Sequence, residues 1–305
     1  MAERVTYKDV ETISKFRINV IIGLALLFIS LPIIINYAVL FISSFSNKML
    51  SGMTVHEIKF TLENWRMFFS GRLSTTQAIL RNFWDIMRYI FNTLVVGLGV
   101  SAVVTLTSMM SGYAFSRMKF KGRKFLMQFL ILLHAFPGVA LIIAVYTMYI
   151  AFKLSVPEHY LKMYSFTYVV FARAALEVPM SIWIMKGFFD RIPWEVEWSA
   201  LVDGASRVYV WRRIILPLVK PGIATVAIFS FLAGWEDLIY VRTFLPITEK
   251  TLATYIEGLL SEGSLEIVHL PAVAAAGMFY LLPTILFFIF ARSYMLQTSM
   301  SGVKM

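Results

Sequence analysis

Six apolar stretches, each long enough to cross a bilayer as a helix, constrain the fold of this 305-residue chain more than any other feature. A helix needs about 20 apolar residues to span the hydrocarbon core. The stretches cover residues 18–42, 89–113, 125–151, 164–187, 222–241 and 271–291. Hydrophobic residues make up 59% of the chain and charged residues 15%, whereas a soluble domain is nearer one quarter charged. The sequence therefore predicts an all-α, polytopic membrane protein with six transmembrane helices.

Lysine and arginine are concentrated in alternate loops, and this asymmetry orients the predicted helices. Six spans place both termini on one side, together with the loops that follow the second and fourth spans. These segments hold 17 of the 28 basic residues, against ten in the longer loops opposite. The positive-inside bias therefore predicts that both termini, including an uncleaved tail at 1–17 and a tail at 292–305, are cytoplasmic. The same bias accounts for the net charge of +10 without a nucleic-acid-binding surface.

Two polar segments interrupt the predicted membrane domain, which covers residues 18–291. The outer segment, 43–88, is long and contains "TLENWRMFFSG", whose Trp65, Phe68 and Phe69 suit a helix at the outer membrane surface. The other segment, 188–221, lies on the cytoplasmic side between the fourth and fifth spans. We call this second segment the elbow.

The elbow is predicted to form two short helices joined by a sharp turn. A first helix over 194–202 runs into the pair Asp203 and Gly204, where glycine tolerates the positive φ of a tight turn. A second helix begins after Ser206, a good N-cap residue, and Pro217 stops or bends it. On physical grounds alone, the elbow is either a docking surface for another protein or a solvated connector.

The elbow and three other segments carry a resemblance to a known family. The elbow contains "WSALVDGASRVYVWRRIILPLVKPGI", which resembles the EAA loop of permease subunits from binding-protein-dependent ABC importers. Segments similar to the maltose-type, six-span sugar permeases are "SGYAFSRMKFKGRK" at 111–124, "MKGFFDRIPWEVE" at 185–197 and "GWEDLIY" at 234–240. The final "SGVKM" resembles the usual end of these proteins, so the resemblance covers most of residues 18–305.

This resemblance implies a multi-pass subunit of a heteromeric importer in a prokaryotic inner membrane. A second homologous permease would pair with it, two ATPase subunits would bind from the cytoplasm, and an extracytoplasmic sugar-binding protein would dock opposite. The chain has no G-x-x-x-x-G-K-[ST] motif to hold ATP phosphates, so ATP and Mg would belong to the ATPase. This subunit would then be neither an enzyme nor a cofactor-binding protein. A maltose-, trehalose- or oligosaccharide-like substrate is favoured by the resemblance, while glycerol phosphate or a sugar alcohol stays open.

By the same resemblance, the elbow would be the coupling helix that passes ATP-driven closure of the ATPase subunits to the membrane domain. Its candidate residues are Glu197, Trp198, Ser199, Ala200, Asp203, Gly204, Ala205, Trp211 and Pro217. The usual glutamate of the family falls at Trp198, with Ser199 and Ala200 at the two alanine positions. Either Glu197 substitutes from the adjacent position, which points about 100° away, or Trp198 makes an apolar contact instead.

Charged residues inside the predicted spans mark a candidate translocation pathway, made of Arg173, Glu177, Trp235, Glu236 and Asp237. Arg173 and Glu177 are four residues apart, so they share one face of the fourth helix and can pair. Glu236 and Asp237 lie inside the fifth span. A charge near the bilayer centre costs about 2.5–3.5 kcal/mol, so such residues usually face a bundle interior or water. The structural alternative is that the first pair neutralises itself and the second lies near the outer interface.

Two other functional classes compete with the importer interpretation. A self-sufficient secondary transporter or channel also uses intramembrane charges, but no inverted repeat with paired broken helices is visible, and the elbow would have no purpose. An intramembrane enzyme is disfavoured because the four histidines lack metal-ligand spacing, the chain has no cysteine, and no nucleophile–base arrangement is visible.

Overall fold

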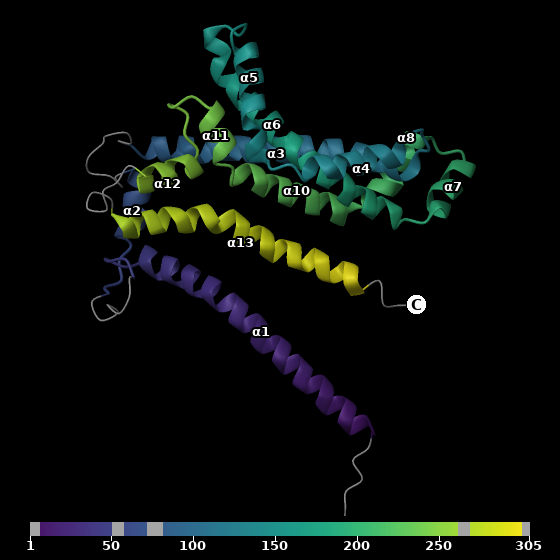
Figure 1. Ribbon diagram of the computed structural model, residues 1–305, viewed down its shortest axis with the longest axis horizontal. Coiled ribbons are helices and arrows are strands. Elements are labelled where there is room, and N and C mark those ends of the chain that lie inside the picture. Colours follow the sequence, from purple (N-terminus) through teal and green to yellow (C-terminus); the bar gives the residue numbers. More distant parts are fainter. Residues whose placement is uncertain (1–6, 51–57, 72–81, 262–268, 301–305) are drawn as a thin grey trace, which may run out of the picture. The chain divides into compact units, whose positions relative to one another are not determined.

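The computed structural model describes residues 7–50, 58–71, 82–261 and 269–300 (Figure 1). Within these ranges every regular element is helical, apart from an isolated antiparallel bridge between Ser46 and Phe60, which confirms the predicted all-α class. The predicted tails at 1–17 and 292–305 fall partly outside the described ranges, and "SGVKM" falls wholly outside them. The helices are α1 (Tyr7–Ser44), α2 (Glu63–Ser70), α3 (Phe83–Arg117), α4 (Arg123–His134), α5 (Ile142–Lys153), α6 (Leu161–Asp190), α7 (Trp194–Val202), α8 (Arg207–Val210), α9 (Leu216–Leu218), α10 (Lys220–Trp235), α11 (Ile239–Phe244), α12 (Leu252–Ser261) and α13 (Leu270–Met300).

Four helices in the described ranges are long and apolar enough to cross a membrane, and two bent pairs bring the number to six if each pair is one span. The four are Ile18–Ser44, Phe83–Arg117, Glu158–Asp190 and Leu270–Ile289. One bent pair, Arg123–His134 with Gly138–Lys153, replaces the predicted third span, which is therefore not a continuous helix. The other pair, Arg207–Leu218 with Lys220–Trp235, bends before the predicted fifth span begins and joins the elbow to α10.

The predicted third span, 125–151, is broken by a 91° bend between His134 and Gly138. Pro137 lies at the break with extended backbone, φ −65° and ψ 123°. Proline has no N–H to donate and disfavours helical backbone in the residue before it, so α4 ends there and a new helix starts.

The predicted fifth span, 222–241, is also shorter than expected. Helix α10 ends at Trp235, and a 73° bend separates it from the helical segment Arg207–Leu218 before it. Glu236 and Asp237 consequently lie at the break between α10 and α11 rather than inside a continuous span, which corrects their predicted position.

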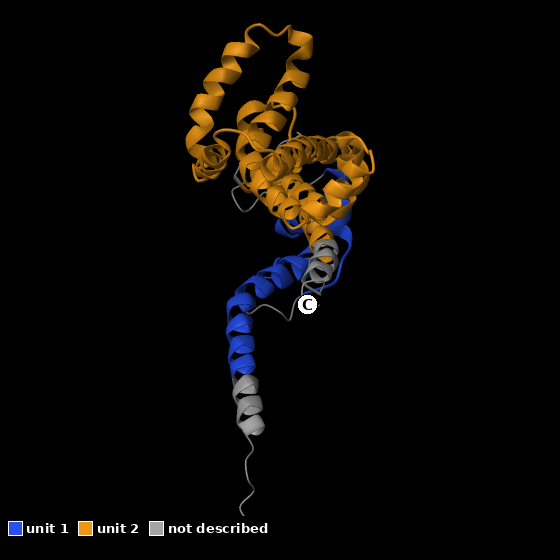
Figure 2. Ribbon diagram, turned by 90° about the vertical axis from the view of Figure 1, so that its right-hand side faces the viewer, with its two compact units in different colours: residues 1–77, 264–279 blue, residues 78–263, 280–305 orange. Residues whose placement is uncertain are grey.

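The chain forms two compact units, residues 1–77 with 264–279 and residues 78–263 with 280–305 (Figure 2). In the first unit α2 forms where the amphipathic pattern predicts a helix. Its Asn64 side chain donates hydrogen bonds to the carbonyls of Ser44 and Ser46 beyond the end of α1, at 3.1 and 2.7 Å. Phe68 is fully buried, and its ring lies tilted against that of Phe279 with 5.5 Å between the ring centres, so it packs against protein instead of a membrane surface.

The second unit is built around α3, α6 and α10, whose backbones approach closely at glycines. A Cβ atom on Gly234 of α10 would lie 3.0 Å from the Cα of Gly97 on α3, and one on Gly112 would lie 2.8 Å from the Cβ of Met185 on α6. Small residues let membrane helices pack at short range. The fully buried side chains between these helices include Val96, Val100, Val104, Val169 and Met185.

A buried carboxylate, Glu249, joins the beginnings of α3 and α6 in the second unit. Its side chain is 5% exposed, forms an ion pair with Arg88, lies 2.9 Å from Lys162 Nζ, and accepts a hydrogen bond from Asn92 Nδ2 at 3.2 Å. Burial raises the pKa of Glu249, but the hydrogen bonds from Lys162, Arg88 and Asn92 outweigh it and hold the pKa below its usual value. The ionised carboxylate therefore stabilises the folded state.

Replacing Glu249 with glutamine is expected to lower stability at neutral pH by about 1 kcal/mol, because both basic partners are half exposed and solvent screens them. Since the folded-state pKa is depressed, the advantage of the wild type is present above the unfolded pKa. It disappears as the pH falls through the folded value. Thermal unfolding of both proteins in detergent between pH 7 and pH 3 measures this, with E257Q, at the exposed Arg242 pair, as the control. A difference that does not change with pH would contradict the assignment.

Candidate functional site

The elbow turn is a helix C-cap that favours glycine. Helix α7 ends at Val202, Asp203 is its C-cap residue, and Gly204 has φ +84°. The N–H of Gly204 donates to the carbonyl of Leu201 at 3.1 Å, and the N–H of Ala205 donates to that of Ala200 at 3.0 Å. These two bonds make a Schellman motif, in which the residue after the C-cap takes the left-handed conformation. The predicted turn at this glycine is therefore present.

The second helix of the elbow begins where the sequence predicts, and the chain bends just after Pro217, which is one of the two predicted alternatives. Ser206 Oγ accepts a hydrogen bond from the N–H of Tyr209 at 3.3 Å and caps α8. The helix continues through a π turn, Trp211–Ile215, into α9, which contains Pro217. Proline cannot donate the next helical hydrogen bond, so the shift in register just before it is expected. The chain bends after α9, so Pro217 precedes the bend without ending the helix.

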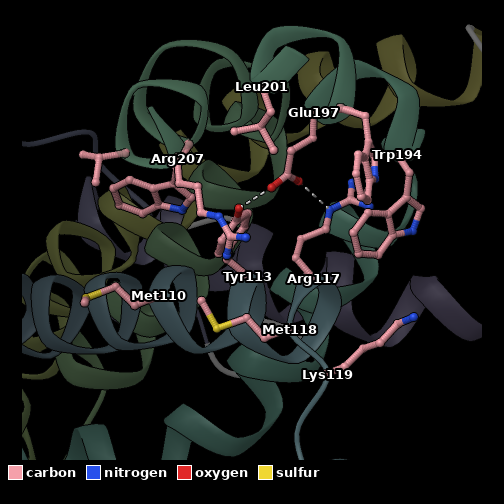
Figure 3. Close-up of a pocket in the computed structure, with 12 residues that line it drawn as sticks. Met110, Tyr113, Arg117, Met118, Lys119, Trp194, Glu197, Leu201 and Arg207 are labelled. Carbon is pink, nitrogen blue, oxygen red and sulfur yellow. Dashed lines mark hydrogen bonds and ion pairs between the residues drawn. The ribbon is translucent and has the colours of Figure 1, made fainter. Parts of the chain in front are cut away.

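Adjacent residues Glu197 and Trp198 have different surroundings. Figure 3 shows Glu197 pointing toward Tyr113 and Arg117. The Glu197 side chain is buried and accepts a hydrogen bond from Tyr113 Oη at 2.6 Å, and its Oε2 lies 3.5 Å from Arg117 Nε. Trp198 is 60% exposed. The sequence left open whether Glu197 or Trp198 takes the place of the family's usual glutamate. Of these two residues, only Trp198 has an exposed side chain in this structure.

Arg117 connects the end of α3 to the start of the elbow. Its Nη2 donates to the carbonyls of Phe189 and Ile192 at 3.0 and 2.6 Å, and its guanidinium carbon lies 4.6 Å from the centre of the Trp194 ring. These carbonyls belong to the last turn of α6 and the residues after it, which need partners from outside the helix. In the sequence, Arg117 counts only as one of the basic residues that orient the predicted helices. This role was not predicted, because the partners of Arg117 are more than 70 residues away.

The remaining elbow candidates divide between an outer surface and a cavity. Ser199, Asp203 and Gly204 are exposed, whereas Ala200 and Ala205 are partly buried. Trp211 is partly buried, and it lines a cavity of about 900 Å³ together with Met110, Met118, Trp194, Trp198 and Leu201. In Figure 3 this cavity lies between the end of α3 and the elbow.

The pathway candidates meet at a second, more polar cavity of about 570 Å³, lined by Arg173, Glu177, Glu236 and Asp237 with His134 and Tyr240. Arg173 Nη1 donates to Glu177 Oε1 at 2.8 Å, as the four-residue spacing predicts. Its Nε also lies 3.0 Å from Asp237 Oδ2 and 3.2 Å from the carbonyl of Ala233. One guanidinium thus neutralises carboxylates from two elements, a link that the sequence did not predict.

Asp237 also explains why the fifth span breaks where it does. Its Oδ1 accepts hydrogen bonds from the N–H groups of Tyr240 and Val241, at 2.9 and 3.0 Å, and so starts α11. Glu236 Oε1 accepts a hydrogen bond from Thr284 of α13 at 3.0 Å. Trp235 is buried, donates from Nε1 to the carbonyl of Tyr280 at 3.0 Å, and is not among the residues that line the cavity.

Comparisons with known proteins agree with these features. Residues 104–294 match the family described as "Binding-protein-dependent transport system inner membrane component". The chain is 30% identical to the maltodextrin transport system permease protein MdxG of Bacillus subtilis over 70% of this chain and 74% of the relative. It is 28% identical to the trehalose transport system permease protein SugB of Mycobacterium tuberculosis, over 80% and 82% of the two chains.

A solved structure shares the fold. A chain from a bacterial ABC transporter involved in the import of the acidic polysaccharide alginate matches with a TM-score of 0.64 and 17% identity, over 96% of this chain and 99% of that one. The family match covers more than half of the present chain, including α6, the elbow and α10. It confirms the resemblance first seen in the elbow sequence. The chain belongs to the family of inner membrane components of binding-protein-dependent transport systems.

Proposed function

We propose that this chain is a permease subunit of an ATP-driven, binding-protein-dependent sugar importer. The observation that carries the proposal is the family match over 104–294, which includes both the elbow and the polar cavity. Relatives named for maltodextrin and trehalose favour a maltose-, trehalose- or oligosaccharide-like substrate. The chain would cross the inner membrane six times, with the bent pair α4 and α5 as the third span and α10 as the fifth, and with both termini in the cytoplasm.

In this proposal the subunit pairs with a second homologous permease. Two ATPase subunits bind on the cytoplasmic side, and a sugar-binding protein docks on the opposite side. ATP and Mg are used by the ATPase, and this chain is non-catalytic. The elbow docks on the ATPase through its exposed side, where Trp198 and Val202 are 60% and 81% exposed. An exposed indole beside an exposed valine suits an apolar cleft, because burying large apolar side chains drives most protein association. Closure of the ATPase pair then moves the elbow and switches the pathway between its inward-facing and outward-facing states.

The polar cavity forms part of the proposed translocation pathway. Carboxylates accept hydrogen bonds from sugar hydroxyls and the guanidinium donates to them, so Arg173, Glu177, Glu236 and Asp237 can bind a polyol without requiring a charged substrate. Their insertion cost is offset by Arg173, which pairs with both Glu177 and Asp237. Trp235 contributes indirectly, because its packing against Tyr280 supports the break that carries Glu236 and Asp237.

Affinity purification tests the assembly. When the neighbouring transport genes are expressed together, a tag on this chain is expected to recover a second permease and an ATPase, and the purified complex is expected to hydrolyse ATP. A self-sufficient secondary transporter or channel predicts the opposite result. Recovery of this chain alone, active in transport after reconstitution, would overturn the proposal.

A further inference from the structure

We propose that Tyr113 and Arg117 are positioning residues that lock the elbow to α3, and that Glu197 is the anchor they hold rather than a contact to the ATPase. This inference rests on the proposed coupling function of the elbow. Its consequence is that a displacement of the elbow is delivered to α3 through one side-chain cluster, made of Tyr113, Arg117, Glu197 and Trp194 (Figure 3).

The two charged members of the cluster are buried, whereas Tyr113 is partly buried and Trp194 is exposed. Arg117 and Glu197 are each 8% exposed, although both carry charges. The short contact is the 2.6 Å hydrogen bond from Tyr113 to Glu197, whereas the Arg117 Nε to Glu197 Oε2 distance of 3.5 Å is that of an ion pair without a good hydrogen bond. Tyr113 therefore fixes the position of the carboxylate, and Arg117 supplies the neutralising charge.

Arg117 extends the same cluster to α6. Its two hydrogen bonds to the carbonyls of Phe189 and Ile192 cover the end of α6, and its cation–π contact holds Trp194 at the start of α7. A second bond, from Ser116 Oγ to Asp190 Oδ1 at 2.6 Å, joins the same two helix ends. The linker between α6 and α7 is thus tied to α3 on both sides of Arg191.

Helix α3 is suited to carry movement away from this cluster. It has 35 residues, so it is about 50 Å long at 1.5 Å per residue. Along that length it packs closely on α10 at Gly97 and on α6 at Gly112. At its beginning, Arg88 and Asn92 bind the buried Glu249. A displacement at the elbow end is therefore transmitted by a packed helix that is anchored at both ends.

Glu197 is not free to serve an outside partner at the same time. To reach a basic residue of an ATPase it would have to leave Arg117 and Tyr113, and the buried guanidinium would lose its counter-charge. Trp198 is already on the exposed side of α7. The two adjacent residues thus divide two tasks: Trp198 faces the partner, and Glu197 ties the elbow to its own membrane domain.

The test compares assembly, ATP hydrolysis and transport in the reconstituted complex. Y113F removes one hydroxyl and is expected to assemble and hydrolyse ATP, while the sugar transported per ATP falls about tenfold, the size expected for losing a hydrogen bond to a buried charge. E197Q is expected to show the same loss of transport per ATP. Y113F removes the hydrogen bond to Glu197, and E197Q removes the charge beside Arg117. Because both changes weaken one cluster, the loss in the double variant should be smaller than the product of the two single losses.

Matched variants separate this inference from the proposed function itself. Y160F, at an exposed tyrosine that precedes α6, is expected to leave every measurement unchanged, and W198A is expected to weaken ATPase binding. R117K keeps the charge, but a single ammonium group cannot replace both the Nη2 contacts to the two carbonyls and the Nε contact to Glu197, so it should also lower transport per ATP. Normal transport per ATP in both Y113F and R117K would overturn the inference, as would loss of ATPase binding in E197Q. Failure of the wild-type chain to bind any ATPase would instead overturn the proposed function.

Discussion

Replacing Gly204 with valine is expected to lower ATPase binding and transport at least tenfold while membrane insertion is unaffected. Gly204 has φ +84°, a conformation that a β-branched residue adopts only at a cost of about 1–3 kcal/mol. No heavy atom lies within 4 Å of the position that a Cβ would take, so the expected effect comes from backbone strain and not from a clash. The strained chain is expected to leave the Schellman motif, which changes the angle between α7 and α8.

Two further variants make this prediction specific. G204N is expected to retain most activity, because asparagine tolerates the left-handed conformation better than other side chains. G122V places the same strain at Gly122, φ +85°, in the loop before α4, and is expected to leave ATPase binding intact. Co-purification of the ATPase and transport in vesicles are the measurements. Unchanged ATPase binding in G204V would mean that the elbow is only a connector.

Replacing Arg173 with alanine is expected to have the largest effect on assembly. The change leaves Glu177 and Asp237 without their shared counter-charge and removes a donor to the Ala233 carbonyl. We expect a loss of about 3 kcal/mol, at the low end for breaking a buried pair because the guanidinium is 19% exposed. The yield of folded complex by size-exclusion chromatography measures the effect. K186A, at a more exposed pair with Asp190 in the same helix, is the control.

A compensated variant separates a structural role from a pathway role. R173L, E177L and D237N combined remove all three charges, while asparagine keeps an acceptor for the N–H groups that begin α11. Assembly is expected to recover, because replacing a complete buried ion network with apolar groups is far less costly than breaking it. If the cavity is part of the translocation pathway, transport stays low in this assembled complex. Recovery of both assembly and transport would limit these residues to a structural role.

Several features of this protein followed from local spacing in the sequence. Apolar lengths near 20 residues predicted the all-α membrane class, and the Asp203–Gly204 pair predicted a turn whose glycine does adopt positive φ. The four-residue spacing of Arg173 and Glu177 predicted their ion pair. The family resemblance could also be recognised from the sequence, since the residues that carry it lie in contiguous segments. In each case the geometry of a single helix or turn determines the result, so no knowledge of packing is needed.

The breaks in the third and fifth spans were not predicted, although their causes are visible in the sequence. Pro137 is one of several prolines in apolar stretches, and Pro32, Pro179 and Pro283 lie inside continuous helices. What decides between a tolerated proline and a broken helix is whether neighbouring groups satisfy the freed carbonyls. The second break, between α10 and α11, likewise involves Asp237, which accepts hydrogen bonds from the backbone that follows it while Arg173 balances its charge.

Only the tertiary structure decided which charged groups meet. Glu197 binds Tyr113 from 84 residues away, and Glu249 meets Arg88 from 161 residues away. The sequence determined that adjacent residues Glu197 and Trp198 point in different directions, but it did not determine which of them faces outward. That choice depends on which face of α7 packs against the end of α3. The packing of one helix face on another is set by the shape and burial of both surfaces together, and no spacing within either segment encodes it.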